Sequence, residues 1–172
     1  MPTQQGSLSL LNDPIAQQLL VAPIPGHLSY VWSDGSPRVI PIGFEWNGSE
    51  LVTGTPDNSP KLKVLKDGSP VAVTIDSYTA PFHVLYMRGI VRLSPYEGIV
   101  PEWMLASERL MGKEGAQAFA QGVESMLKAG VLKFVRLTVQ PNWVGIIDFE
   151  TRFPSGVEKG MEALMKGQAS QQ

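Results

Sequence analysis

The residues best suited to bind an anion lie in one short segment of the sequence. Lys61, Lys63 and Lys66 fall within six positions, in a chain with 14 lysines and arginines in all. They follow Ser59-Pro60, a pair typical of a helix start, where free backbone N–H groups and the helix dipole favour an anion. A serine hydroxyl, free N-terminal amides and two lysines are what a terminal phosphate group needs, and a solvated helix face is the other interpretation.

A second segment combines a strand pattern with a proline. Residues 38–44 read Arg-Val-Ile-Pro-Ile-Gly-Phe, with Pro41 inside an otherwise strong strand. Proline cannot donate a hydrogen bond to a neighbouring strand, so this segment is expected at a sheet edge or at an irregularity. The neighbouring amides would then be free to bind a planar heterocycle. A simple bulged edge strand explains the same residues.

Other kinds of chemistry have little support in the sequence. The two histidines, His27 and His83, are 56 positions apart and have no second ligand at metal spacing, and the chain has no cysteine. Nucleophile elbows, phosphate-binding glycine loops and paired carboxylates are missing as well. We therefore predict no metal, no assignable catalytic residue, and either a bound cofactor or no catalysis. Four side chains could reach a substrate or simply pack: Tyr78, Tyr86, Arg88 and Trp143.

Composition narrows the class of protein further. The 172 residues carry a net charge of −2 and a pI of about 5.7, which argues against nucleic-acid binding through a large basic field. No apolar run approaches the roughly 18 residues that a membrane span needs. The first cationic residue is Arg38, so no secretory signal is expected, and the predicted location is the cytoplasm.

Alternating apolar residues predict strands at 28–32, 38–46, 51–55, 71–75, 83–93 and 131–149, the last interrupted near Pro141-Asn142. Helical spacing and caps predict helices from Asp13-Pro14, from Ser59 to Asp67-Gly68, at 101–111, at 114–129 and at about 156–166. Six short, mostly antiparallel strands tend to close into a barrel, which removes exposed edges. We expect one domain over 1–172, with a core at 13–150, a helical insertion at about 101–129, and a C-terminal helix and tail at 151–172.

Several of these segments, in this order, resemble a known superfamily. They are Tyr-Val-Trp-Ser-Asp-Gly-Ser-Pro-Arg-Val-Ile-Pro-Ile-Gly-Phe at 30–44, Leu-Val-Thr-Gly-Thr at 51–55, Ser-Pro-Lys-Leu-Lys-Val-Leu at 59–65, Val-Ala-Val-Thr-Ile-Asp at 71–76, Ala-Pro-Phe-His-Val-Leu-Tyr-Met-Arg-Gly at 80–89 and Val-Arg-Leu-Thr-Val-Gln-Pro-Asn-Trp at 135–143. Together they resemble the pyridoxamine 5′-phosphate oxidase-like FMN-binding split-barrel superfamily, over about residues 15–150.

The resemblance implies a fold, an assembly and a cofactor. The fold would be a mainly β, six-stranded antiparallel split barrel with peripheral helices, and two copies would form a homodimer that holds FMN between the barrels. Residues in three segments would contact the cofactor. By analogy, Val39, Ile40, Pro41 and Ile42 would line the flavin ring, Thr53 and Gly54 would flank it, and Ser59, Lys61 and Lys63 would hold the phosphate.

Two departures set the chain apart from true pyridoxamine phosphate oxidases. Gly43 stands where those enzymes carry a lysine, and Arg152-Phe153-Pro154 replaces their terminal Arg-Leu-x-Pro segment. The helices at 101–129 instead resemble those of an uncharacterised branch that includes flavin and deazaflavin reductases. The expected function is an FMN-dependent oxidoreductase of unknown substrate. The alternatives are a deazaflavin-dependent reductase and a non-catalytic flavin- or haem-binding module.

Overall fold

The structure is a computed structural model and describes residues 5–153, 156–161 and 163. It begins with a 3-10 helix, η1 (Leu8–Asn12), and the helix α1 (Pro14–Val21). Asp13 caps α1 as predicted, because its carboxylate accepts a hydrogen bond from the Ile15 N–H at 2.9 Å and Pro14 occupies the first turn.

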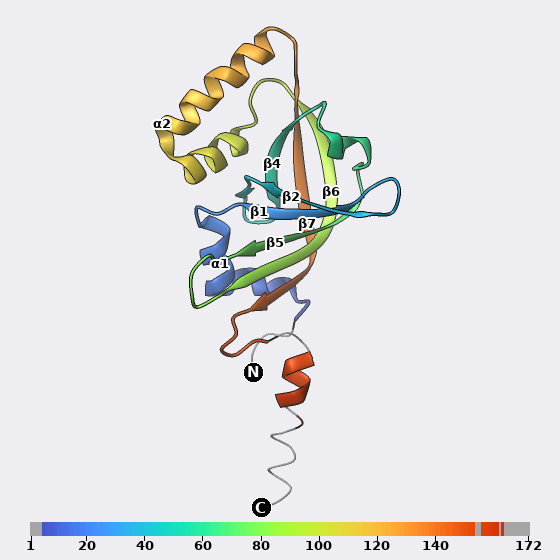
Figure 1. The fold of residues 1–172 in the computed structure, drawn as a ribbon, viewed down its shortest axis with the longest axis vertical. Coiled ribbons are helices and arrows are strands. Elements are labelled where there is room, and N and C mark those ends of the chain that lie inside the picture. The colour runs from blue at the N-terminus through green and yellow to red at the C-terminus, as the bar shows by residue number, and fades with distance from the viewer. Residues whose placement is uncertain (1–4, 154–155, 162, 164–172) are drawn as a thin grey trace, which may run out of the picture.

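One antiparallel sheet forms the body of the protein (Figure 1). Its strands lie side by side in the order β2-β1-β5-β6-β7-β4-β3. Their bounds are β1 (Gly26–Val31), β2 (Pro37–Ile42), β3 (Glu45–Trp46), β4 (Leu51–Pro56), β5 (Pro70–Asp76), β6 (Val84–Tyr96) and β7 (Phe134–Ile147). The mainly β, antiparallel class predicted from the sequence is confirmed. The expected closure that removes exposed edges is not found, because the sheet is open, with β2 and β3 as its two edges.

The sheet has seven strands, so the prediction of six was wrong. The stretch predicted as one strand over 38–46 divides at Gly43-Phe44 into β2 and β3, which pair with different neighbours. Pro41 lies in β2, whose other edge pairs with no described strand. The sheet edge is therefore where the proline rule placed this segment.

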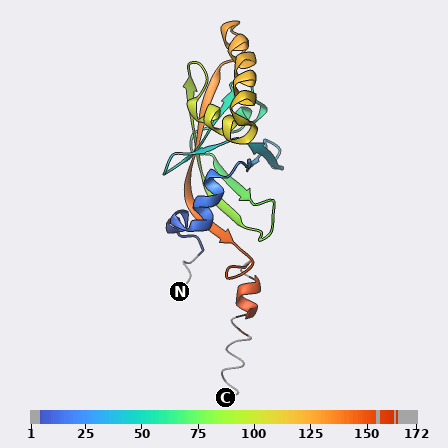
Figure 2. The same cartoon turned by 90° about the vertical axis from the view of Figure 1, so that its left-hand side faces the viewer.

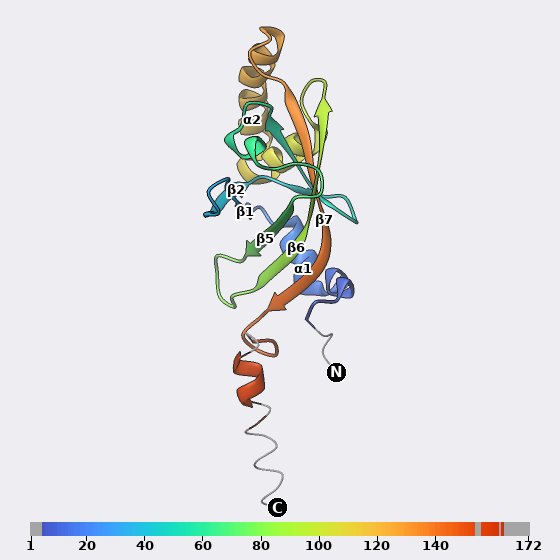
Figure 3. The same cartoon turned by 90° about the vertical axis from the view of Figure 1, so that its right-hand side faces the viewer.

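The two longest strands, β6 and β7, hold the sheet together (Figure 3). Their pairing shifts register between Arg88 and Gly89, because Arg88 pairs with Trp143 and Gly89 with Pro141, which leaves Asn142 as an extra residue. This bulge is the interruption predicted near Pro141-Asn142. A side chain at Gly89 could not fit, since its Cβ would lie 2.4 Å from the Gln140 carbonyl oxygen.

Helix α2 (Pro101–Lys128) connects β6 to β7 and lies near the opposite end of the sheet from α1 (Figures 1 and 2). The two helices predicted at 101–111 and 114–129 are its two halves. They meet at Gly112, whose φ of 79° interrupts the helical backbone. Only glycine adopts this conformation without strain.

The short helix after Ser59 differs from its prediction. The 3-10 helix η2 (Pro60–Lys63) ends at Lys63, well before Asp67-Gly68, and the Ser59 side chain does not cap it. The hydroxyl of Ser59 instead lies 2.9 Å from that of Thr55 on β4. Near the C-terminus, residues 156–161 and 163 are helical, and the rest of the helix predicted at 156–166 lies outside the described residues.

The main hydrophobic core lies between the inner face of the sheet and the N-terminal helices. Phe44, Leu10, Leu20 and Leu28 are among its fully buried side chains. A smaller core forms where α2 packs on the end of β7, around Val100, Val123 and Phe134. The outward-facing residues Ser29, Ala72 and Arg88 of β1, β5 and β6 belong to neither core.

Candidate functional site

The predicted phosphate site centres on Lys61, where η2 packs against β4. The Lys61 Nζ donates a hydrogen bond to the Thr55 hydroxyl at 2.5 Å, and that hydroxyl is paired with Ser59. No carboxylate lies within ion-pair distance of Lys61 in the described part of the chain. A cation and two hydroxyls therefore meet at one point without a counterion.

Burial affects the charge of this lysine. Lys61 is partly buried, and loss of contact with water lowers the pKa of its ammonium group below the ordinary value of 10.5. An anion bound beside the ammonium would offset this cost, because an opposite charge favours the protonated form. The donor set suits a phosphate, which accepts hydrogen bonds from ammonium and hydroxyl groups.

The other two lysines of the cluster lie differently. Lys63 is exposed at the end of η2, and Lys66 is exposed beyond it. Within the described residues, neither lysine donates a side-chain hydrogen bond to the Thr55–Ser59 pair. The structure thus brings Ser59 and Lys61 together, and it places Lys63 in the same short helix without a contact to them.

Thr53 and Gly54 lie on β4, next to the end of β2. The buried Thr53 hydroxyl donates a 2.6 Å hydrogen bond to the Gly43 carbonyl, directly after Ile42. Gly54 faces α2, and a Cβ there would lie 2.9 Å from that of Trp103 and 3.1 Å from that of Val100. Thr53 therefore connects the two predicted segments, whereas the side-chain face of Gly54 is filled by the protein itself.

The predicted ring-lining residues of β2 alternate between the two faces of the sheet. Val39 and Pro41 are exposed on the outer face, Ile40 is half-buried, and Ile42 belongs to the main core. Only Val39 and Pro41 thus present side chains to a ligand outside the sheet. Contacts by Ile40 and Ile42 would have to come from the backbone of this edge strand.

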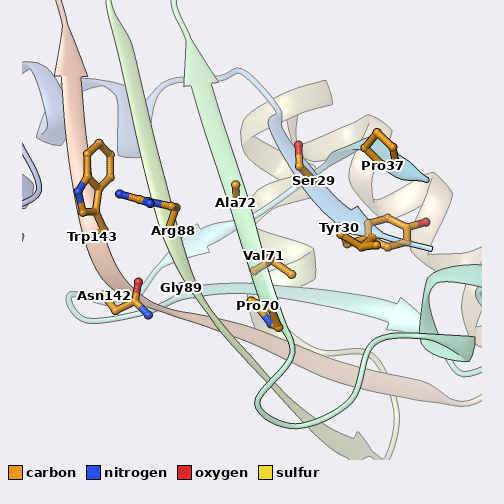
Figure 4. Close-up of a pocket in the computed structure, with 11 residues that line it drawn as sticks. Ser29, Tyr30, Pro37, Pro70, Val71, Ala72, Arg88, Gly89, Asn142 and Trp143 are labelled. Carbon is orange, nitrogen blue, oxygen red and sulfur yellow. The ribbon is translucent and has the colours of Figure 1, made fainter. Parts of the chain in front are cut away.

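Sequence reasoning missed Thr55, which joins Ser59 to Lys61. Thr53 and Thr55 are two positions apart on one buried strand face, and this pairing of hydroxyl groups was the available signal. A groove in the surface was missed as well. It has a volume of about 640 Å³ and lies on the outer face of the sheet, lined by residues of β1, β2, β5, β6 and β7, among them Arg88 and Trp143 (Figure 4).

The two positions that depart from pyridoxamine phosphate oxidases are closed by local packing. Gly43 faces α2, where a Cβ would lie 3.2 Å from Leu110 and 3.5 Å from Ala106. Arg152 is nearly buried and forms ion pairs with Asp13 at 2.6 Å and Asp148 at 2.9 Å. Neither position offers a free cation to a substrate.

The described residues contain no group of three or more His, Asp or Glu side chains placed to hold a metal ion. Among the described helices, none combines the length and apolarity required to cross a membrane.

Comparison with known proteins identifies the fold. No protein-family model and no curated protein matches the chain. Solved structures do match. An F420 reductase superposes with a TM-score of 0.54 and 21% identity, covering 77% of this chain and 95% of its own. A candidate pyridoxamine 5′-phosphate oxidase from Listeria innocua gives 0.53 and 22%, with 80% and 98% covered. An FAD- and haem-binding protein from Mycobacterium smegmatis gives 0.53 and 20%, with 89% and 76% covered.

These likenesses establish the architecture. The chain has the split-barrel fold seen in pyridoxamine 5′-phosphate oxidase-like proteins, in an F420 reductase and in an FAD- and haem-binding protein. The resemblance found in the sequence is thereby confirmed at the level of the fold. Identities of 20–22% in these three comparisons carry no assignment of cofactor or substrate.

Proposed function

We propose that this protein binds FMN and acts as an oxidoreductase. The observation that carries the proposal is the partly buried Lys61 ammonium, which has hydroxyl neighbours and no described carboxylate. Its position on a fold shared with flavin-related proteins supports a flavin phosphate as the missing anion.

Different residues of the site would bind different parts of the cofactor. Lys61, Ser59 and Thr55 would hold the phosphate, with Lys63 adding long-range attraction from the helix end. Val39 and Pro41 would support the ring on the outer face of β2. The flavin would supply hydride or electron transfer when bound, and the protein would supply position and shielding from water.

The proposed substrate is not pyridoxamine 5′-phosphate. Helix α2 covers Gly43, and the guanidinium of Arg152 is engaged by two carboxylates. We expect FMN-loaded protein to form no useful amount of pyridoxal 5′-phosphate from this substrate. Robust formation in a direct assay would contradict that expectation.

We also propose that two copies form a homodimer with the cofactor at their interface. Val31 and Val39 are each 61% exposed on neighbouring strands at the edge of the sheet, where a second copy would cover them. Sedimentation equilibrium at micromolar concentration should show a dimer, and Val39→Asp should shift it toward monomer. A monomeric parent protein would contradict the proposal. A cytoplasmic location remains a prediction from the sequence.

FMN titration of the cofactor-free protein tests the phosphate site directly. A charge-assisted hydrogen bond is worth roughly 1.5–3 kcal/mol, so Lys61→Ala should weaken FMN binding about ten- to a hundredfold. Lys63→Ala should also weaken binding, by less. Lys66→Ala makes the same charge change on an exposed neighbour and should have little effect.

Riboflavin provides the matched ligand, because it keeps the ring and lacks the phosphate. It should bind the parent protein more weakly than FMN and respond little to any of the lysine changes. If all three alanine variants keep the parental FMN affinity, the cluster is only a solvated helix face. The assignment of FMN would then lose its physical support.

A deazaflavin-dependent reductase is the second candidate, favoured by the likeness to an F420 reductase. Deazaflavin cofactors carry a longer anionic tail, which would call for a basic groove extending beyond the lysine cluster. The absorption spectrum of purified protein separates flavin from deazaflavin. It also reveals a Soret band if the protein is instead a haem-binding module.

A further inference from the structure

The groove on the outer face is built on a single row of residues that crosses five strands. Strand pairing sets Val39 opposite Ser29, Ser29 opposite Ala72, Ala72 opposite Arg88 and Arg88 opposite Trp143. On β1, β5 and β6 the neighbours of these residues along the strand are buried, so this row points outward. Figure 4 shows Ser29, Ala72, Arg88 and Trp143 spread across the face in that order.

The side chains in the middle of the row are small, and those on either side of them are larger. Ser29 and Ala72 have small side chains, and adjacent strands are about 4.8 Å apart, so together they give a floor roughly 10 Å wide. Arg88 and Trp143 form one wall, and Val31 and Pro37, which pair across β1 and β2, form the other. The volume of about 640 Å³ lies within the range of small-molecule sites.

The arrangement of side chains around Arg88 suits the binding of a flat anion. The guanidinium carbon lies 4.2 Å from the centre of the Trp143 ring, and that ring also packs against Tyr86 at 4.9 Å. Gly6 also lies close to Trp143, since a Cβ there would come within 2.7 Å of the indole nitrogen. A stacked guanidinium keeps its N–H edge available for bidentate contact with a carboxylate.

Arg88 also lacks a competing partner. Within the described residues it makes no ion pair and donates no side-chain hydrogen bond. The bulge next to it turns the exposed Asn142 side chain toward the groove, where its amide adds a donor (Figure 4). A cation, an amide and an aromatic ring thus converge at one end of a floor made of small side chains.

We infer that this groove is the substrate site and that it takes a planar, conjugated molecule carrying a carboxylate. The ring lies across Ser29 and Ala72, and the carboxylate meets Arg88. The substrate part of the inference rests on the proposed flavin function, because Val39 stands at the end of the same row and is a proposed ring-lining residue. A ligand on the floor would therefore lie beside the flavin.

Binding of 2-naphthoate to FMN-free protein, followed by calorimetry, tests the groove without the cofactor. The neutral 2-naphthamide has the same shape and should bind at least tenfold more weakly. Arg88→Gln should weaken 2-naphthoate binding by tenfold or more and leave 2-naphthamide unchanged. Arg92→Gln, an equal charge change on the same face of β6 outside the groove, should bind like the parent.

A steric variant gives a second, independent readout. Ala72→Leu raises the floor and should abolish binding of both probes, while circular dichroism confirms that the sheet is intact. Equal 2-naphthoate affinity in the parent and in Arg88→Gln, or no saturable binding to the parent, would overturn the anion site. A change in oligomeric state caused by Ala72→Leu would show that a second copy fills the groove, and would overturn it too.

The flavin-loaded protein decides whether the site serves the proposed reaction. In the parent, 2-naphthoate should perturb the visible absorption of bound FMN, and in Arg88→Gln this change should be lost while FMN affinity stays parental. If FMN does not bind at all, the proposed function fails, yet the calorimetry still decides the anion site. If both ligands bind and the flavin spectrum stays unchanged, the groove is no substrate site.

Discussion

Arg152 is nearly buried and Lys61 is partly buried, and their charges are compensated in different ways. The guanidinium of Arg152 contacts Asp13 at 2.6 Å and Asp148 at 2.9 Å. The ammonium of Lys61 donates a hydrogen bond to the Thr55 hydroxyl and forms no ion pair among the described residues. One cation is fully compensated by the fold, and the other is left for a ligand to compensate.

The difference shows which part of the molecule contributes stability and which contributes binding. Arg152 joins the segment after β7 to the start of α1, since Asp13 also caps that helix. Asp148 reinforces the link by accepting backbone hydrogen bonds from Glu150, Thr151 and Arg152. Lys61 ties no distant segments together, because η2 follows β4 directly in the chain.

Removing the compensated charge should have the largest effect. Arg152→Met leaves two carboxylates without their cation, and breaking such a buried arrangement costs about 3 kcal/mol of unfolding free energy. Urea denaturation followed by circular dichroism measures the change. Arg92→Met, at an exposed position, should stay within about 0.5 kcal/mol of the parent. Equal stability of the two variants would remove the structural role assigned to Arg152.

Lowering the pH should weaken the cluster formed by Arg152, Asp13 and Asp148, with a smaller loss of stability than Arg152→Met causes. The pKa values of Asp13 and Asp148 are held below the ordinary range by hydrogen bonds from Arg152 and from backbone N–H groups, which outweigh burial. Because the pKa values of these two carboxyl groups are lower in the folded protein than in the unfolded protein, the ionised groups contribute stability above about pH 4. This contribution is lost as the pH falls through the folded-state pKa values.

Between pH 5 and pH 3 we therefore expect the parent to lose on the order of 2 kcal/mol more stability than Arg152→Met. The variant loses less because its two carboxylates titrate closer to their ordinary pKa values. Urea midpoints measured across this range at constant ionic strength provide the test. Parallel pH profiles for the two proteins would contradict the coupling.

The sequence predicted the fold better than the site, for a physical reason. Alternation, caps and turn residues are local signals, and they located α1, the long strands and the break at Gly112. The division of 38–46 depends instead on α2, where Arg109 pairs with Glu45 at 2.5 Å and donates to the Phe44 carbonyl. Such a long-range contact leaves no local pattern.

The candidate site shows the same limit. The lysine cluster was visible as a local run of charge, but the partnership of Lys61 with Thr55 depends on how η2 folds back on β4. The row from Val39 to Trp143 joins five strands that are scattered along the chain. Only strand register, which the sequence does not specify for non-consecutive strands, brings Ser29, Ala72 and Arg88 into line.

The uncompensated charge should make FMN binding sensitive to alkaline pH. Burial lowers the pKa of Lys61 below 10.5, so its proton is lost at a lower pH than that of an ordinary lysine. FMN affinity should fall about tenfold as the free Lys61 deprotonates, since a charge-assisted contact becomes a neutral one. Fluorescence titrations above pH 7.5, with riboflavin as the control for ring titration, should show this fall in the parent. A similar fall in Lys61→Ala would assign it to another group.

The smallest expected effect is the sharpest test of the comparison. Lys61→Met removes a partly desolvated charge, keeps the length of the side chain, and leaves the Thr55 and Ser59 hydroxyls bonded to each other at 2.9 Å. Replacing a poorly compensated charge with an apolar group is often neutral or stabilising, so the cofactor-free variant should gain about 0–1 kcal/mol in unfolding free energy. Excess FMN should reverse the order, because a ligand stabilises the folded protein in proportion to the logarithm of its concentration over Kd. Urea denaturation with and without FMN measures both. A loss of stability comparable to that of Arg152→Met would mean that the fold itself uses Lys61, and the contrast between the two cations would no longer hold.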